Sequence, residues 1–307
     1  MDERAFITQN GTEGIEIIDL ACHKIPLHRS QIQINFSDNF SNKSDTWIEK
    51  SVKLIWDEKC QENNRLYNKS KFRFDSIAIC NDHQIVINLG LTTYMELIGT
   101  NCHPFGKELV LHGMKCFKNG RSCLADPLGV GCLLLTADEK FLFLKRAMWT
   151  GEDKGKLDRP GGHPEPDNVS LAIQSWTEEE CRKPENLRRI RDEIFDSVIH
   201  EVRDEVNLPM ETIKDPVLLG VIRSLERSGR PSAEFLVLCS LTSEEVEELY
   251  SKNCQAEADE SIGIVFILEG KIRTQVLEQH VWNNLTDAAC GAIELYSRCY
   301  SVSPNKQ

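Results

Sequence analysis

Apolar and charged residues repeat with a helical period between residues 184 and 206. The apolar positions, three or four apart, are Leu187, Ile190, Ile194, Val198, Val202 and Val206. This spacing is typical of one amphipathic helix, because side chains three and four apart share a face. Pro184 suits a first helical position, Asn207 can adopt the left-handed conformation that ends a helix, and Pro209 prevents continuation. The pattern therefore predicts one helix over residues 184–206.

The first third of the chain contains shorter patterns of both kinds. Residues 46–60 have the period of a helix, whereas residues 71–80 and 84–91 alternate apolar and polar side chains like two strands joined by a short turn. A short helix is predicted over residues 93–97. Residues 1–30 show no clear period and are rich in turn formers, so we expect a weakly ordered start.

The remainder of the chain alternates strands with helices. Strand patterns occur over residues 130–136, 141–145, 217–223, 233–240 and 262–268. Thr242 is predicted to begin a helix, because Glu245 three residues later completes a capping box, and residues 276–298 are predicted as a final helix. This order indicates an α/β domain with a mixed sheet over residues 121–307, preceded by a smaller αβ subdomain over residues 1–120.

A glycine turn precedes the long helix, in the segment PGGHPEP at residues 160–166. Gly161 and Gly162 permit a tight turn and leave backbone carbonyls accessible to a ligand. Near the end of the helix, Glu201 and Glu205 lie one turn apart, on or beside the apolar stripe. Like charges at this spacing oppose a helix by roughly 0.2–0.5 kcal/mol, and burying an unpaired carboxylate costs several kcal/mol more. A hard cation would remove both penalties, so the turn and the helix together favour a metal site over the solvated surface that a charge run usually forms.

The glycine turn and the segment HEVRDEVNL, residues 200–208, together resemble the Nudix box, which holds divalent metal over a pyrophosphate. Relative to that box, the three acids are present as Glu201, Asp204 and Glu205, the arginine is replaced by His200 and the glycine by Asn207. Residues 167–191 lie between the turn and the box part of the helix, where an ordinary box has a short fixed interval. Asp192 falls at the position of the box's first glutamate, with Glu193 beside it. The resemblance implies a Nudix α/β/α sandwich.

Blocks within and outside the box resemble a group of animal Nudix hydrolases that split UDP-glucose and UDP-galactose. These blocks, between about residues 67 and 265, are KFR, GLTTY, IGTN, ADPLGVG, PGGHPEP, DEVNLP, SAEF and CSLT. The resemblance implies hydrolysis of the UDP-sugar pyrophosphate to UMP and hexose 1-phosphate. It also implies Mg²⁺ as the cofactor, with Mn²⁺ as a substitute. The expected partner is a small-molecule nucleotide sugar, and protein partners are unknown.

The three acids of the box are the candidate catalytic residues. Glu201 and Glu205 are expected to bind the metal directly, and Asp204 could hold a second ion through water. Pyrophosphate hydrolysis requires mainly positioning and charge neutralisation. Which carboxylate orients the attacking water stays open. Two later acids, Glu234 and Glu260, are expected to have structural roles.

Seven further residues are candidate substrate contacts, namely Tyr67, Tyr94, Arg146, Gly151, Asp158, His163 and Glu165. The two tyrosines could stack on uracil, with core packing as the alternative for each. Arg146 could grip a phosphate or simply solubilise a strand end. His163 and Glu165 could contact substrate or metal, or else brace the turn. Asp158 could accept hydrogen bonds from sugar or base, and Gly151 could bring the backbone close to the ligand.

Composition narrows the partners and the compartment. The 307-residue chain carries 48 acidic and 36 basic residues, and its formal net charge of −12 argues against a nucleic-acid surface or binding to anionic lipid. No apolar run approaches the length of a membrane span, and the start MDERAFITQN lacks the apolar core of a signal peptide. The 12 cysteines include no CxxC pair and are expected to be mostly small buried hydrophobes in a reducing compartment. We expect a cytoplasmic protein, with nuclear access left open.

Two alternatives to a UDP-sugar diphosphatase follow from the same residues. A Nudix-fold nucleotide sensor that binds without turnover is suggested by His200 and by the insertion over residues 167–191. A Nudix pyrophosphatase for another nucleoside diphosphate compound, such as ADP-ribose, is the second. The intact acidic set favours an enzyme over a sensor, and the resemblance of the first part of the chain to the uridine group disfavours ADP-ribose.

Overall fold

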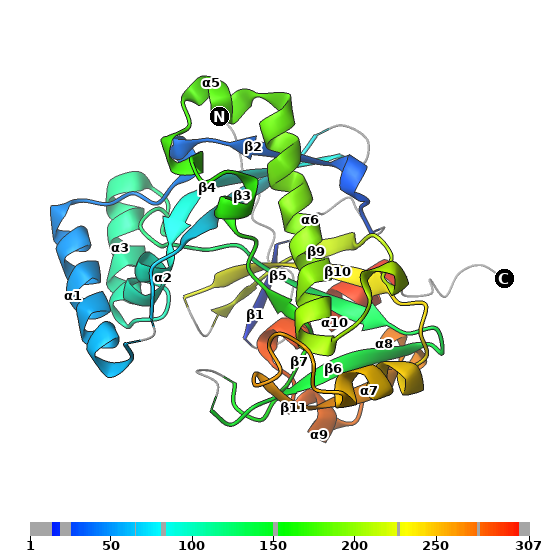
Figure 1. The fold of residues 1–307 in the computed structure, drawn as a ribbon. Coiled ribbons are helices and arrows are strands. Elements are labelled where there is room, and N and C mark those ends of the chain that lie inside the picture. The colour runs from blue at the N-terminus through cyan, green and yellow to red at the C-terminus, as the bar shows by residue number, and fades with distance from the viewer. Residues whose placement is uncertain are drawn as a thin grey trace.

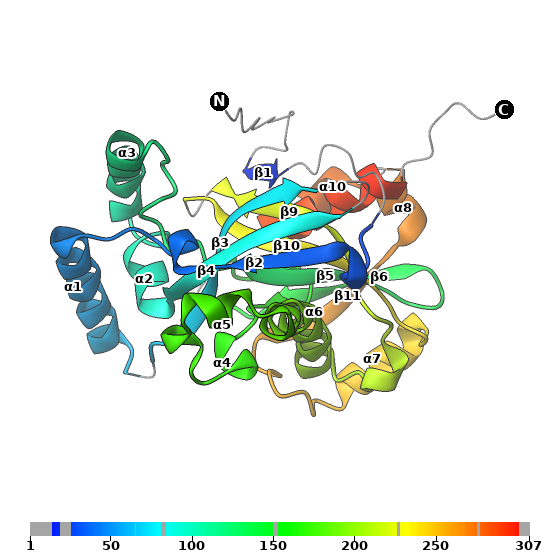
Figure 2. The ribbon, with the colours of Figure 1, turned by 90° about the horizontal axis from the view of Figure 1, so that it is seen from above.

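Two β-sheets and the helices around them make up the part of the chain that the structure describes (Figure 1). The computed structural model describes residues 14–18, 26–64, 66–80, 84–149, 153–225, 228–274 and 277–300. Figure 2 shows α6 and α10 on opposite sides of the strands, with α1, α2 and α3 grouped at one end. The predicted α/β sandwich with a mixed sheet and a second, smaller sheet is confirmed.

The larger sheet has the strand order β1-β9-β10-β5-β6-β11. Its strands are β1 (Ile15–Ile18), β5 (Gly129–Leu135), β6 (Lys140–Arg146), β9 (Val217–Ser224), β10 (Arg230–Leu238) and β11 (Ser261–Leu268). Strands β10 and β5 run parallel, whereas the other neighbours along this order are antiparallel. Two short strands extend it, with β7 (Leu157–Asp158) paired to β6 and β8 (Gly161–Gly162) paired to β5. The sheet is therefore mixed, and the glycine turn is one of its strands.

The smaller sheet has the order β2-β4-β3. Strands β3 (Ser70–Ile79) and β4 (Ile85–Thr93) form the predicted antiparallel pair, and β2 (Ile32–Phe36) lies parallel to β4. Within β2 the residues alternate between buried and exposed, as a strand with one face on a core requires. Strand β2 was not predicted, because only five residues carry its pattern.

The helices vary widely in length. They are α1 (Thr46–Glu62), α2 (Tyr94–Gly99), α3 (Phe105–Phe117), α4 (Pro166–Val169), α5 (Glu178–Arg182), α6 (Pro184–Val206), α7 (Ser243–Ser251), α8 (Glu269–Arg273), α9 (Gln279–Trp282) and α10 (Asp287–Tyr300). The predicted boundaries of α6 are confirmed, with Pro184 in its first turn and Asn207 in the left-handed conformation at φ 65°. The capping box that begins α7 is also present.

One hydrophobic core joins the two sheets. Phe72 and Leu89 from the smaller sheet, Val130 from the larger sheet, and Val198 and Val202 from α6 belong to one buried cluster. A second cluster fills the space between α10 and the other side of the larger sheet. The apolar stripe of α6 therefore packs against both sheets at once, which fixes the position of the acids at its C-terminal end.

The expectation of a weakly ordered start is wrong for residues 15–18. These residues form β1, which pairs along β9, and the side chains of Ile15 and Ile17 are buried in the core under α10. Leu27, also buried, bridges to Leu218 on β9. Four residues are too few to show a period, and their partner strand lies at the other end of the chain. Residues 1–13 and 19–25, to which the same expectation applied, lie outside the described residues.

The single final helix predicted over residues 276–298 is divided in the structure. Helix α9 ends at Trp282, and α10 begins only at Asp287. Thr286 separates them, because its hydroxyl accepts a hydrogen bond from the N–H of Ala289 and starts a new helix. Helix α3, which the sequence patterns did not predict, packs against α1 through Leu109 and Ile48.

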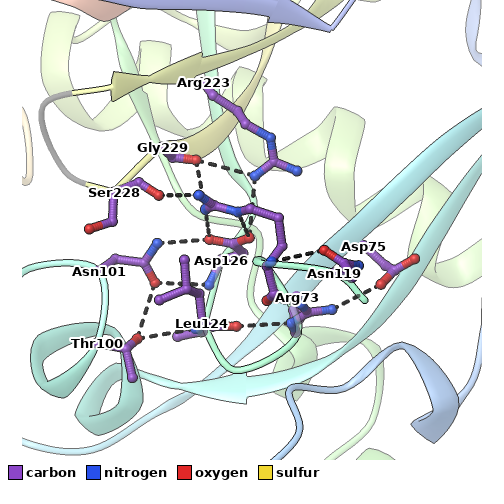
Figure 3. A network of polar contacts seen from close by, with 12 residues as sticks. Arg73, Asp75, Thr100, Asn101, Asn119, Leu124, Asp126, Arg223, Ser228 and Gly229 are labelled. Atoms are coloured by element: carbon purple, nitrogen blue, oxygen red, sulfur yellow. Dashed lines mark hydrogen bonds and ion pairs between the residues drawn. The ribbon is translucent and has the colours of Figure 1, made fainter. Parts of the chain in front are cut away.

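A buried polar network ties the smaller sheet to the larger one (Figure 3). Asp126 is fully buried between Arg121 and Arg223. The guanidinium of Arg223, on β9, donates to the Asp126 carboxylate over 3.2 Å. Asn101 also donates to its carboxylate, over 2.7 Å. Arg73 on β3 is 2% exposed and donates to backbone carbonyls, including that of Leu124 at 3.1 Å. Strand β3 is thus held to the segment that leads into β5 and to β9.

Candidate active site

The glycine turn and the end of α6 are in direct contact. The N–H of Gly161 donates to Glu205 Oε2 over 2.9 Å. A Cβ atom on Gly162 would lie only 2.0 Å from Glu201 Oε1, so this glycine leaves the space that the Glu201 carboxylate occupies. The structure therefore brings Glu201 and Glu205 against the turn, as a metal site built from the two segments requires.

A loop before β11 adds two further acids to this place. Carboxylate oxygens of Glu205, Glu257 and Glu260 all lie within 4.8 Å of one another. The loop is fixed at both ends, because the N–H of Glu257 donates to the carbonyl of Asp204 and the N–H of Ala147 donates to that of Glu260, each over 2.9 Å. Glu257 was not predicted, and Glu260 was expected to be structural. The acidic run just before the last strand was the one available signal.

Burial and mutual repulsion raise the pKa values of these carboxyls. Burial, with the charges of Glu257 and Asp204, raises the pKa of Glu201 to about 8. Burial and the charge of Glu201 raise the pKa of Glu205 well above its ordinary value. Burial and the charge of Glu260 raise the pKa of Glu257. A hard divalent cation prefers carboxylate oxygens and removes this repulsion, so the donor set fits such an ion.

Asp204 lies beside this group and also pairs with its own neighbour. Its carboxylate accepts a hydrogen bond of 2.6 Å from Nε of Arg203, and it is part of the charge that acts on Glu201. Its backbone carbonyl oxygen accepts a hydrogen bond from the N–H of Glu257. Asp204 therefore contributes to the site through its backbone as well as through its charge.

A buried ion pair supports the glycine turn from below. Arg159, just before the turn, donates to both carboxylate oxygens of Glu234 over 3.0 and 2.9 Å, and also to Ser232. Gly131 makes room for this arginine, since a Cβ there would lie 2.2 Å from the guanidinium carbon. Glu234 therefore has the structural role expected for it. Its ion pair with Arg159 holds the residue that precedes the glycine turn against β10.

Asp158 and Arg146 bind each other on the same side of the site. The Arg146 guanidinium lies 3.3 Å from Asp158 Oδ2. Oδ1 of Asp158 accepts from the Thr286 hydroxyl over 2.7 Å and from the N–H of Arg159 over 2.9 Å. Asp158 therefore joins the turn to the start of α10, and its contact with sugar or base stays a prediction.

Glu165, at the end of the turn, is paired with two lysines from the smaller sheet. Its carboxylate lies 3.0 Å from Nζ of Lys69 and 3.5 Å from Nζ of Lys71. Its N–H donates to Glu193 Oε1 on α6 over 2.9 Å. Asp192, which aligns with the first glutamate of the box, instead lies 3.6 Å from Arg29. Glu193, rather than Asp192, therefore supports the turn.

The remaining sequence candidates are in different surroundings. His163 has a half-buried ring whose Nε2 is enclosed and has no hydrogen-bond partner among the described residues. Tyr67 is 66% exposed, and Nζ of Lys69 lies 5.4 Å from the centre of its ring. Tyr94 packs edge-on against Trp56 of α1, at 5.9 Å between ring centres. Gly151 lies outside the described residues.

Trp149 is a further candidate that the sequence patterns did not single out. Its indole N–H donates to the carbonyl of Asp259 over 2.9 Å, while the side chain is 68% exposed. An aromatic face is therefore held beside the acidic loop, open to a ligand.

Among the residues that the structure describes, no helix is long and apolar enough to cross a membrane.

Comparison with known proteins gives the family. No family model matches the chain. The chain is 36% identical over 282 residues to uridine diphosphate glucose pyrophosphatase NUDT22 from Mus musculus, an alignment that covers 91% of this chain and 89% of that protein. It is 30% identical over 235 residues to Nudix hydrolase 9 from Arabidopsis thaliana, covering 73% of this chain and 75% of the relative. The chain belongs to the Nudix hydrolase family.

The likeness of this Nudix hydrolase to solved structures is weaker. A MutT protein from Methanosarcina mazei Go1 superposes with a TM-score of 0.34 at 18% identity, covering 56% of this chain and 92% of that one. Family membership therefore rests on the sequence relatives.

A methyl group on Gly162 is expected to reduce activity with little loss of stability. In Gly162→Ala, the new Cβ meets the flexible end of Glu201, so the carboxylate moves and the fold does not. We expect kcat/KM to fall about 10- to 100-fold, because small displacements of catalytic groups have effects of this size. Gly263→Ala, where nothing lies within 4 Å, is the control. In Gly161→Ala the Cβ would meet the Val130 carbonyl at 2.4 Å, so that variant should instead lower the melting temperature.

Proposed function

We propose that this Nudix hydrolase hydrolyses the pyrophosphate of UDP-sugars, UDP-glucose and UDP-galactose, to UMP and hexose 1-phosphate. The observation that carries the proposal is the group of carboxylates from Glu201, Glu205, Glu257 and Glu260 packed against the glycine turn. The substrate class is supported by the 36% identity to a relative named uridine diphosphate glucose pyrophosphatase. The resemblance in sequence blocks extends over the smaller sheet, where KFR carries Lys71 and GLTTY carries Tyr94.

The metal of the proposed reaction is Mg²⁺, with Mn²⁺ as a substitute. Glu205, Glu257 and Glu260 would hold it, and Glu201 would complete the set, since these side chains offer only oxygen donors. When bound, the ion supplies charge neutralisation at the diphosphate and lowers the pKa of a bound water. This chemistry matches the raised pKa values of Glu201, Glu205 and Glu257, which come from burial and from neighbouring carboxylates.

The protein's own groups would position the reactants. A carboxylate of the cluster accepts the proton of the attacking water, whose oxygen bonds to one phosphorus while the bond from that phosphorus to the bridging oxygen breaks. Asp204 pairs with Arg203, whereas Glu201 and Glu205 both contact the glycine turn. All three acids of the box remain candidates for this role.

We assign uracil stacking to Tyr67 rather than Tyr94. Tyr67 presents an exposed ring beside Lys69, which pairs with Glu165 on the catalytic turn. The ring of Tyr94 is occupied by its edge-on packing with Trp56. The different surroundings of the two rings support Tyr67 over Tyr94 as the residue that stacks on uracil.

Tyr67→Ala is expected to raise the KM for UDP-glucose about tenfold and to change kcat by less. Base-to-aromatic stacking is worth roughly 1–3 kcal/mol, and it acts far from the reacting phosphorus, so it contributes mainly to ground-state binding. Steady-state kinetics would measure the split. Tyr67→Phe keeps the ring and should behave like wild type. An unchanged KM in the alanine variant would remove Tyr67 from the uridine site.

A substrate panel tests the function as a whole. The full-length protein would be incubated with UDP-glucose, UDP-galactose, ADP-glucose and ADP-ribose, with and without Mg²⁺, and UMP or AMP release would be measured. We expect cleavage of both UDP-hexoses that depends on Mg²⁺, and poor cleavage of the adenosine compounds. Equal kcat/KM for uridine and adenosine substrates would indicate a generic Nudix pyrophosphatase. Tight binding of UDP-glucose without cleavage would indicate a sensor.

We also propose a division of labour along the chain. Residues 1–120 would contribute substrate recognition and residues 121–307 the chemistry, with β1 as the part of the first unit that joins the larger sheet.

We propose that the protein is located in the cytoplasm. The described cysteines are free thiols, and a reducing compartment such as the cytoplasm maintains that state.

A further inference from the structure

Two lysines of the smaller sheet extend to the glycine turn. Lys71 lies on β3, and Lys69 lies two residues earlier, so both side chains are on one side of the strand. Both ammonium groups bind the carboxylate of Glu165, at 3.5 Å for Lys71 and 3.0 Å for Lys69. The Lys71 side chain is 13% exposed. A cation is therefore held, largely buried, at the edge of the catalytic turn.

Glu165 fixes these lysines relative to the metal carboxylates. Its own N–H is bound by Glu193 on α6, and Gly161, four residues earlier, donates to Glu205. The charge of Lys71 acts to lower the pKa of Glu201, against the rise that burial and the neighbouring acids cause. Lys71 therefore lies within electrostatic reach of the carboxylate cluster, although it belongs to the other sheet.

The carboxylate of Glu165 pairs with two ammonium groups, in a chain whose formal net charge is −12. The nearby carboxylate of Glu193 accepts hydrogen bonds from the N–H of Glu165 and from the Asn168 amide. An imidazole completes this side of the turn, because burial and the charges of Arg230 and Lys71 lower the pKa of His163 and keep it neutral. Its enclosed Nε2 has no hydrogen-bond partner among the described residues. Cationic and neutral polar groups next to a metal site are the surroundings that a phosphate anion requires.

We propose that Lys71, positioned by Glu165 and assisted by Lys69, binds the diphosphate of the substrate from the side of the smaller sheet. The inference rests on the proposed function and adds the residue by which the smaller sheet takes part in the chemistry. The lysine would neutralise phosphate oxygens that face away from the metal carboxylates. The smaller sheet would then contribute a phosphate-binding cation in addition to a surface for the base.

A purely structural role for Lys71 predicts a different experimental result. If Lys71 served only to offset the charge of Glu201, its removal would strengthen Mg²⁺ binding and leave anion binding alone. If it binds phosphate, its removal weakens anion binding even when Mg²⁺ saturates the site. The two affinities therefore move independently, and both can be measured on the full-length protein.

The test is calorimetric titration with methylenediphosphonate, a pyrophosphate analogue that is not hydrolysed and carries neither base nor sugar. At saturating Mg²⁺ we expect Lys71→Met to weaken its binding about 10- to 100-fold, as the loss of one charge-assisted hydrogen bond implies. Lys71→Arg should bind within a few-fold of wild type. Lys59→Met is the matched control, because Lys59 also pairs with a glutamate, Glu62, but lies on α1. Thermal unfolding of each variant reports whether it folds.

The outcomes separate this inference from the proposed function. Binding of the analogue by Lys71→Met within twofold of wild type, or no binding by wild type at all, would overturn the inference. If Lys71→Met fails to fold, Lys71→Arg and Glu165→Gln decide, since displacement of the lysine in Glu165→Gln should weaken binding of the analogue several-fold. Binding that depends on Lys71 in a protein that does not cleave UDP-glucose would support the inference while the proposed function fails.

Discussion

Glu205→Gln is expected to lower kcat for UDP-glucose by about 1000-fold or more, because charge stabilisation by a metal is worth several kcal/mol and each 1.36 kcal/mol is a factor of ten. The glutamine amide keeps the size of the side chain, and its oxygen can still accept the N–H of Gly161 that Glu205 accepts at 2.9 Å. It loses the negative charge that the cluster offers to a cation. The measurement is kcat at saturating substrate over a titration of Mg²⁺.

Two controls make this result interpretable. Glu185→Gln changes an exposed glutamate in the first turn of the same helix and should leave kcat unchanged. The circular dichroism of Glu205→Gln should match wild type, and urea unfolding should show no loss of stability, because the change removes one charge from a group of buried, mutually repelling carboxylates. Turnover within tenfold of wild type at saturating Mg²⁺, in a folded variant, would exclude Glu205 as a metal ligand. Should the variant not fold, Glu257→Gln provides the test, since Glu257 is half-buried and lies in a loop.

The part of the site that could be predicted from sequence depends on local signals. Helix α6 begins at Pro184 and ends before Asn207 because of one proline and one left-handed residue, both of which act within a single turn. The positions of Glu201 and Glu205 follow from the helical period alone. Local spacing was therefore sufficient for the box acids and for the glycine turn.

Residues that reach the site through long-range contacts were not predicted from the sequence. Glu257 joins the cluster because its N–H binds the carbonyl of Asp204, and Lys69 meets Glu165 from a position 96 residues away in the chain. Neither contact leaves a period or a motif in the sequence. The same reason explains why β1 was missed, since its burial depends on β9.

Residue type alone does not distinguish residues whose surroundings in the fold differ. Tyr67 and Tyr94 carried identical expectations, but α1 supplies Trp56 to pack against only one of them. Asp158 was a candidate substrate contact, yet its oxygens bind Arg146, Thr286 and the backbone of Arg159. In both cases the competing partner comes from an element distant in sequence.

The buried Asp126 network should dominate the stability of the joined sheets (Figure 3). Burial alone would raise the pKa of Asp126, but Arg121 and Arg223 override it and hold the pKa below its ordinary value. A carboxyl whose pKa is lowered on folding stabilises the folded state above its unfolded pKa, which is about 3.9. That stabilisation is lost as the pH falls toward the lower folded value.

Asp126→Asn is therefore expected to lower the free energy of unfolding by about 3–5 kcal/mol at neutral pH, because it leaves the guanidinium of Arg223, 7% exposed, without its charged partner. The midpoint of urea unfolding, followed by circular dichroism at pH 7 and again near pH 3, would measure the loss. The difference from wild type should shrink at the lower pH, because Asp126 is then largely protonated in the unfolded state and folding has to release that proton. Asp75→Asn is the matched control, since Asp75 also pairs with an arginine of this network, Arg73, but is 20% exposed and should change stability by less than about 1 kcal/mol. Equal midpoints for Asp126→Asn and wild type would mean that the hydrophobic core under α6, rather than this ion network, holds the smaller sheet and its Lys71 against the active site.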